Sequence, residues 1–135
     1  TQGYSSAASD VYKRQNEIST VCTTAIGECD VLYLPTDNTM ASSTETIKNI
    51  VVPAGIPVIA GEEGICRGCG VATLSISYED LGRATGEMAY EILVEGADIS
   101  TMDVRFAPNV TKKYNASICA ELGITAPEGY EAIAE

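Results

Sequence analysis

The chain has 135 residues, of which 45% are hydrophobic and 20% are charged, and this is enough for one globular domain with a hydrophobic core. It contains no histidine, which excludes a Ser-His-Asp triad, a Cys-His pair and a histidine-rich zinc site within this sequence. The net charge of −11 argues against nucleic acid as a partner, because binding phosphates requires a basic surface.

The first fifteen residues look foreign to the rest of the chain. Residues 5–15 read Ser-Ser-Ala-Ala-Ser-Asp-Val-Tyr-Lys-Arg-Gln, which matches the translation of a common transposase-based sequencing adapter. We therefore expect residues 1–15 to be a non-native segment, and the natural reading frame to begin near Asn16. An export signal, if the protein has one, is expected upstream of this sequence.

The first predicted elements alternate between helix and strand. A helix that ends near Gly27 is predicted by apolar residues at i, i+3, i+4 and i+7, which are Ile18, Val21, Cys22 and Ala25. The apolar run at 30–35 predicts a buried parallel strand, followed by a loop at 36–39. Ser42 or Ser43 is expected to cap a second helix that reaches Val51.

The second half continues the alternation. The same signals predict strands at 56–60, 70–77 and 102–106, a polar loop at 61–64, helices at 78–94 and 112–122, and a short turn or helix at 128–134. Strands that alternate with helices indicate an α/β fold with a parallel sheet. Ligands of such folds bind beyond the carboxyl ends of the strands, where Asp37 and Glu62 are expected.

Four segments, in the same order and spacing, resemble one family of binding proteins. The segments are Asp30–Thr39 (DVLYLPTDNT), Gly55–Ala60 (GIPVIA), Gly70–Ala89 (GVATL and SYEDLGRATGEMA within it), and Asn115 with Leu122–Ile124 and Pro127-Glu128. Together they resemble the tryptophan/tyrosine-type substrate-binding proteins of ABC transporters, which have the type I periplasmic-binding-protein fold. The resemblance covers residues 16–135.

This resemblance implies an incomplete protein with two lobes that close on a ligand like a hinge. Residues 16–65 would belong to the C-terminal lobe, residues 66–97 to a crossover and the N-terminal lobe, and residues 98–135 to the return into the C-terminal lobe. The expected protein captures a small solute, such as an amino acid or related amine, outside the cytoplasmic membrane and delivers it to ABC permease subunits. It would be anchored by lipid through a missing N-terminus and would catalyse no reaction.

Asp37 is the leading site candidate, because a carboxylate at a strand end can pair with a ligand ammonium group. The structural alternative is that Asp37 caps the following helix. Asn38 could bind ligand or hold a turn, and Thr36 and Thr39 are further candidates. Glu62 and Glu63 follow the second strand, and one of them is expected to face the ligand. No metal or cofactor is expected at these residues.

Two rival functions remain open from the sequence. A ligand-sensing domain of a transcription regulator can share the two-lobe fold. Cys66 and Cys69 form a C-x-x-C motif, which could serve a thiol oxidoreductase or half of a zinc site. The other cysteines, Cys22, Cys29 and Cys119, supply no second pair with suitable spacing. The glycines of Gly61–Gly70 could suggest a phosphate-binding loop. This interpretation is disfavoured, because the segment lacks the Gly-Lys-Ser/Thr sequence that such loops require.

Overall fold

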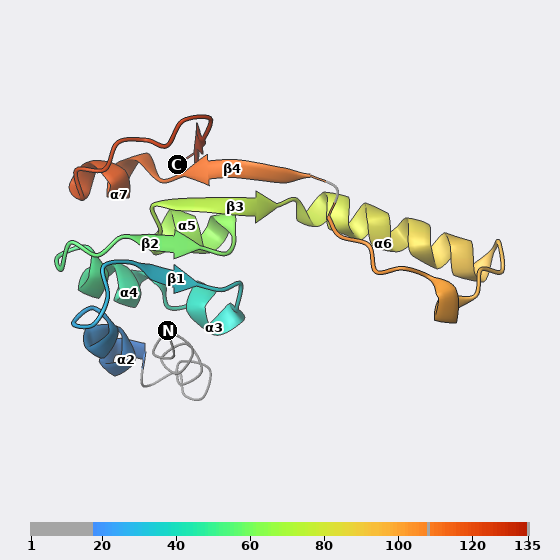
Figure 1. The fold of residues 1–135 in the computed structure, drawn as a ribbon, viewed down its shortest axis with the longest axis horizontal. Coiled ribbons are helices and arrows are strands. Elements are labelled where there is room, and N and C mark those ends of the chain that lie inside the picture. Colours follow the sequence, from blue (N-terminus) through green and yellow to red (C-terminus); the bar gives the residue numbers. More distant parts are fainter. Residues whose placement is uncertain (1–17, 108, 135) are drawn as a thin grey trace. The chain divides into compact units, whose positions relative to one another are not determined.

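A computed structural model describes residues 18–107 and 109–134 of the chain. The prediction for residues 1–15 therefore lies outside the described part. Figure 1 shows helices alternating with strands of one sheet. In chain order, the elements are α2 (Ile18–Ala25), β1 (Leu32–Leu34), α3 (Asn38–Ala41), α4 (Thr44–Val51), β2 (Val58–Ala60), α5 (Glu63–Cys69), β3 (Ala72–Ile76), α6 (Tyr78–Leu93), the 3-10 helix η2 (Ile99–Thr101), β4 (Val110–Tyr114), α7 (Ala116–Glu121) and β5 (Glu131–Ala132).

The sheet has the strand order β1-β2-β3-β4-β5. The pairs β1–β2, β2–β3 and β4–β5 are parallel, whereas β4 points in the opposite direction to β3 (Figure 1). The predicted fold class, α/β with a parallel sheet, is therefore confirmed, with β4 beside β3 as the exception to the parallel order.

The described residues divide into two compact units. The first comprises residues 18–74 and 112–134, and the second comprises residues 75–111. The main core lies in the first unit, where buried side chains of β1 and β2 pack against α2, α4 and α5. A smaller core joins the start of β3 to α7 through Val71, Ala72, Ile118 and Cys119.

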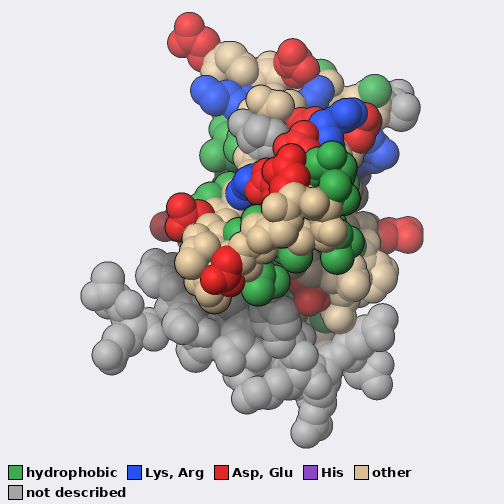
Figure 2. Space-filling view, turned by 90° about the vertical axis from the view of Figure 1, so that its right-hand side faces the viewer, with side chains coloured by type: hydrophobic (Ala, Val, Ile, Leu, Met, Phe, Trp, Pro, Cys, Tyr) green, Lys and Arg blue, Asp and Glu red, His purple; other side chains and the backbone are tan. Residues whose placement is uncertain are grey.

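The described residues of the second unit form no comparable core. No residue of its main helix, α6, is buried, although the sequence predicts an apolar face along it. The exposed side chains of this unit include Leu93, Val104 and Phe106, each at least 80% exposed. Figure 2 shows hydrophobic side chains at the surface beside acidic ones. The described residues of the second unit therefore leave large apolar side chains exposed.

Several predicted elements are corrected by the structure near the C-terminus. No strand forms at 102–106, where Arg105 instead pairs with Glu91 of α6 at 2.6 Å and holds the segment along that helix. The strand lies at Val110–Tyr114, so the predicted helix at 112–122 begins only at Ala116, after its cap Asn115. The end of the chain contains a strand at Glu131–Ala132 instead of a turn or helix alone.

Predictions in the first half also change. The loop expected at 36–39 contains the start of α3, because Asp37 caps a short helix that begins at Asn38. The loop expected at 61–64 contains the start of α5, because Glu62 caps a helix that the polar and glycine-rich sequence hides. The strand at Leu32–Leu34 is parallel as predicted, but it is an edge strand and its central residue, Tyr33, is 63% exposed. The continuous apolar run at 30–35 therefore forms a strand with one buried face, and the described residues leave its other face exposed.

Candidate ligand-binding site

The carboxyl ends of β1 and β2 lie side by side. The two strands are parallel, with Leu34 opposite Ala60, so the segments that follow them leave the same edge of the sheet. The Gly61 N–H donates to the Leu34 carbonyl at 2.8 Å. A Cβ atom at Gly61 would lie 2.7 Å from the Thr36 backbone nitrogen, so this close approach requires glycine. The segments that follow β1 and β2 therefore approach each other closely at Thr36 and Gly61.

Asp37 caps helix α3 with one oxygen of its carboxylate. Its Oδ1 accepts from the backbone N–H groups of Thr39 at 2.8 Å and Met40 at 3.2 Å. The extended backbone of Asp37 suits this N-cap position. Its Oδ2 accepts no hydrogen bond from any described residue. The half-buried carboxylate can therefore hold the helix with Oδ1 and offer Oδ2 to a cationic group.

The three other candidates beside Asp37 differ in how far their side chains are exposed to a ligand. Asn38 is the first residue of α3, and its side chain is exposed. Thr36 is exposed and Thr39 is half-buried. The backbone carbonyl of Thr39 accepts from the Ser42 hydroxyl at 3.0 Å, within α3 and its C-cap. Asn38 and Thr36 therefore stay candidates for ligand contacts, on position alone.

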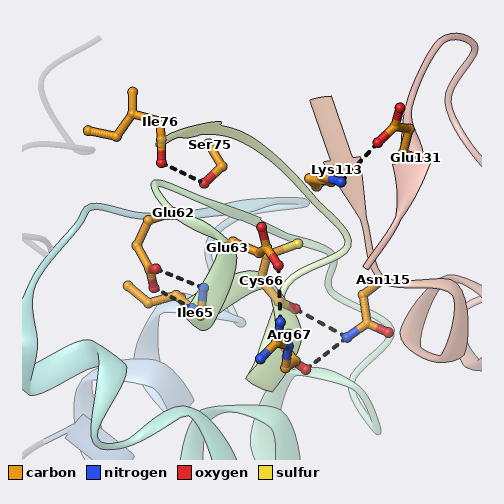
Figure 3. A network of polar contacts seen from close by, with 11 residues as sticks. Glu62, Glu63, Ile65, Cys66, Arg67, Ser75, Ile76, Lys113, Asn115 and Glu131 are labelled. Atoms are coloured by element: carbon orange, nitrogen blue, oxygen red, sulfur yellow. Dashed lines mark hydrogen bonds and ion pairs between the residues drawn. The ribbon is translucent and has the colours of Figure 1, made fainter. Parts of the chain in front are cut away.

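Glu62 and Glu63 already have partners within α5. Figure 3 shows that both carboxylate oxygens of Glu62 accept backbone N–H groups, those of Gly64 and Ile65. Glu63 pairs with Arg67 one helical turn later, at 3.0 Å. The two carboxylates therefore shape the start of α5, and a role for either in ligand binding stays a prediction.

Asn115 joins two parts of the first unit, and sequence reasoning did not assign it a role. Its side-chain amide donates to the carbonyls of Cys66 at 3.1 Å and Arg67 at 2.9 Å, near the end of α5 (Figure 3). Its Oδ1 accepts from the Ile118 N–H and caps α7. Asparagine is a preferred N-cap, but this signal was missed because the helix predicted at 112–122 places Asn115 inside the helix and not before it.

The C-x-x-C cysteines are buried inside the core. Cys66 and Cys69 lie in the middle and at the end of α5, and neither is exposed to solvent. Burial raises the pKa of each thiol to about 12, and for Cys66 the neighbouring Cys119 contributes as well. A redox cysteine requires a thiolate near neutral pH and access to its substrate. The environment of this motif therefore argues against the oxidoreductase alternative.

We predict that Cys29 is the first thiol to react with a maleimide at neutral pH. Cys29 is half-buried, whereas Cys22, Cys66, Cys69 and Cys119 are buried and none of these four thiols has a lowered pKa. Mass spectrometry of the folded chain after brief labelling should show a single addition, while the denatured chain takes five. Rapid native labelling of Cys66 or Cys69 would restore the redox alternative.

The described residues contain no group of three or more His, Cys, Asp or Glu residues that could hold a metal ion. None of the described helices is long and apolar enough to cross a membrane. The chemistry assembled at the ends of β1 and β2 is thus a set of hydrogen-bonding groups and carboxylates.

The family model described as ABC transporter substrate binding protein matches residues 7–135. The chain belongs to this family. The curated tyrosine-binding protein of Clostridioides difficile (strain R20291) is 37% identical over 89 residues, which are 66% of this chain and 26% of that protein. This chain therefore spans a minor part of the length of that relative.

Solved structures agree with this assignment. The ligand-free, open structure of a substrate-binding protein with adhesive properties from Clostridium difficile is 37% identical, with a TM-score of 0.68, over 89% of this chain and 41% of that chain. An ABC domain in complex with L-Trp from Streptococcus pneumonia is 29% identical, with a TM-score of 0.75, over 89% of this chain and 43% of that chain. The chain thus has the fold of part of these binding proteins.

Proposed function

We propose that this chain is part of the extracytoplasmic solute-binding component of an ABC importer, and that it binds an amino acid or a related amine. The observation that carries the proposal is the carboxylate of Asp37, whose Oδ2 is unoccupied by described residues at the shared edge of β1 and β2. A ligand ammonium group would complete the hydrogen bonding of this oxygen. Family membership and the tyrosine- and tryptophan-binding relatives support this ligand class.

The second part of the proposal concerns the lobes. Residues 16–65 and 98–135 would form part of the C-terminal lobe, and residues 66–97 the crossover and part of the N-terminal lobe. The separation of residues 75–111 from the rest supports an excursion of the chain into another lobe and back. The ligand would lie in the cleft between the lobes, and closure of the cleft would retain it. Capture and release need no reaction, so we expect no catalysis.

The remaining parts concern where the protein works. We propose that it lies outside the cytoplasmic membrane, is held there by a lipid anchor on a segment upstream of residue 16, and delivers its ligand to permease subunits. These expectations are supported by the family, whose members are substrate-binding proteins of ABC transporters.

The test requires a protein with both lobes. We define the chimaera as the part of the Clostridioides difficile relative that precedes its matched segment, joined to Ile18 of this chain. Calorimetric titration of the chimaera with L-tyrosine and L-tryptophan should show binding, whereas the 135-residue chain alone should bind weakly or not at all. The matched control ligand is 3-(4-hydroxyphenyl)propionate, which keeps the ring and carboxylate of tyrosine but lacks the ammonium group. Equal affinity for this acid and for L-tyrosine would contradict the proposed role of Asp37.

A further inference from the structure

Gly61 is where the segment after β2 lies against the segment after β1. A Cβ atom at this position would lie 2.7 Å from the backbone nitrogen of Thr36, 2.9 Å from its Oγ1 and 3.1 Å from the carbonyl carbon of Pro35. Cβ atoms of real proteins essentially never approach another heavy atom within 3.0 Å. Only the hydrogen atom of a glycine therefore fits between the two segments.

The φ angle of Gly61 makes no demand for glycine. Among the described residues, positive φ angles occur at four other glycines, which are Gly55, Gly96, Gly123 and Gly129. Where the backbone allows a side chain, exchanging glycine for alanine usually stabilises a protein slightly, because it restricts the unfolded chain. The need for glycine at position 61 thus comes from its contact with Pro35 and Thr36.

The atoms that face Gly61 cannot yield easily. Two of the three nearest atoms belong to the backbone of Pro35 and Thr36, so no side-chain rotation removes the collision. The ring of Pro35 fixes its φ angle. The Gly61 N–H donates to the Leu34 carbonyl at 2.8 Å, and Leu34 is paired with Ala60 in the buried part of the sheet. Relief of the collision would therefore have to come from the segments beyond the two strands.

Asp37 follows directly on this contact. Its Oδ1 accepts from the N–H groups of Thr39 and Met40, so its carboxylate and the start of α3 move together with the backbone of Thr36. With a Cβ atom at Gly61, the Thr36 nitrogen has to retreat by several tenths of an ångström to reach the 3.4 Å of ordinary van der Waals contact. Groups that bind a ligand must be held within about 0.5 Å of their productive positions. A displacement of this size therefore matters for binding.

We propose that Gly61 is a positioning residue, whose missing side chain lets the two segments close up and places the Asp37 carboxylate for a ligand ammonium group. This inference rests on the proposed function, because it takes Oδ2 of Asp37 as the partner of the ammonium group. Glu62 does not offer a substitute, since both of its carboxylate oxygens accept backbone N–H groups at the start of α5. Binding of amine-bearing ligands therefore depends on Gly61, whereas binding of acids without an ammonium group does not.

Replacing Gly61 with Ala in the chimaera should weaken binding of L-tyrosine by about tenfold or more, because small misplacements of a positioned group are costly. Binding of 3-(4-hydroxyphenyl)propionate, which has no ammonium group, should change by less than about threefold. Calorimetric titration with both ligands gives the ratio of the two affinities. A purely structural role of Gly61 would leave this ratio unchanged.

Two further variants serve as controls. Gly68→Ala places a Cβ atom against the side chain of Thr44 in the same unit, so it should lower stability and leave the ratio of affinities unchanged. In the Asp37→Asn background, adding Gly61→Ala should cause little further loss of L-tyrosine affinity, because both substitutions remove the same interaction. Losses that multiply independently would overturn the proposal.

The remaining outcomes separate this inference from the proposed function. An L-tyrosine affinity of Gly61→Ala within about threefold of the parent, or a parallel loss for both ligands, would overturn the positioning role and leave the proposed function standing. A parent chimaera that binds no L-tyrosine, or binds both ligands equally, would refute the proposed function and this inference with it.

If Gly61→Ala prevents folding, Pro35→Gly takes its place. This substitution adds no atom and frees the backbone just before Thr36, so the chimaera should fold and lose several-fold in L-tyrosine affinity while binding of the acid stays the same. An unchanged L-tyrosine affinity in Pro35→Gly would then overturn the proposal.

Discussion

Replacing Asp37 with Asn should weaken binding of L-tyrosine to the chimaera by about 2–5 kcal/mol, or roughly 30-fold to several-thousand-fold in affinity. The substitution keeps the shape of the side chain and removes its charge, so a buried ligand ammonium group loses its counter-charge. Asparagine is as good an N-cap as aspartate, so Oδ1 of the amide can still accept from Thr39 and Met40. We therefore expect the melting temperature to change little while the affinity collapses.

The control for this prediction is Asp30→Asn, which removes the same charge just before β1, at the other end of that strand. Calorimetric titration and thermal melts of the three proteins separate the two roles of Asp37. An affinity of the Asp37→Asn variant within about threefold of the parent would show that Asp37 is a helix cap and nothing more.

Substituting Gly68 with Ala should destabilise the first unit by about 1–3 kcal/mol, although alanine ordinarily favours a helix over glycine by about 1 kcal/mol. A Cβ atom at Gly68 would collide with the side chain of Thr44, at the start of α4. Thr44 is β-branched and stiff, so relief requires α4 and α5 to move apart within the core. Urea unfolding followed by circular dichroism measures the loss.

Two companion variants isolate the collision. Gly86→Ala in α6 adds a Cβ where no atom lies within 4 Å, so it should not destabilise the protein. The double variant Thr44→Gly with Gly68→Ala removes the obstructing Cβ, so the two substitutions should be strongly non-additive. Additive losses in this cycle would show that the glycine serves a different purpose.

The sequence was informative wherever side chains act locally. The helices α2, α4 and α6 follow from apolar periodicity, and the strands β1, β2 and β3 from apolar runs between turn residues. The same reading failed at residues 102–106, whose alternating pattern suits a strand but whose Arg105 pairs with Glu91, fourteen residues away. It failed at α5 because the helix starts with glutamates and glycines, whose weak helical signal is overridden by the Glu62 cap and by packing in the core.

The amino-acid sequence by itself determined the α/β alternation, the family and the placement of Asp37 at a strand end, because each depends on the order and spacing of neighbouring residues. Only the tertiary structure decided that Asp37 caps with one oxygen and leaves the other available, whereas both oxygens of Glu62 are engaged. It also decided that the C-x-x-C thiols are buried and that Gly61 lies against the backbone of Thr36. These properties depend on which residues meet across long stretches of chain, and local patterns carry no information about such meetings.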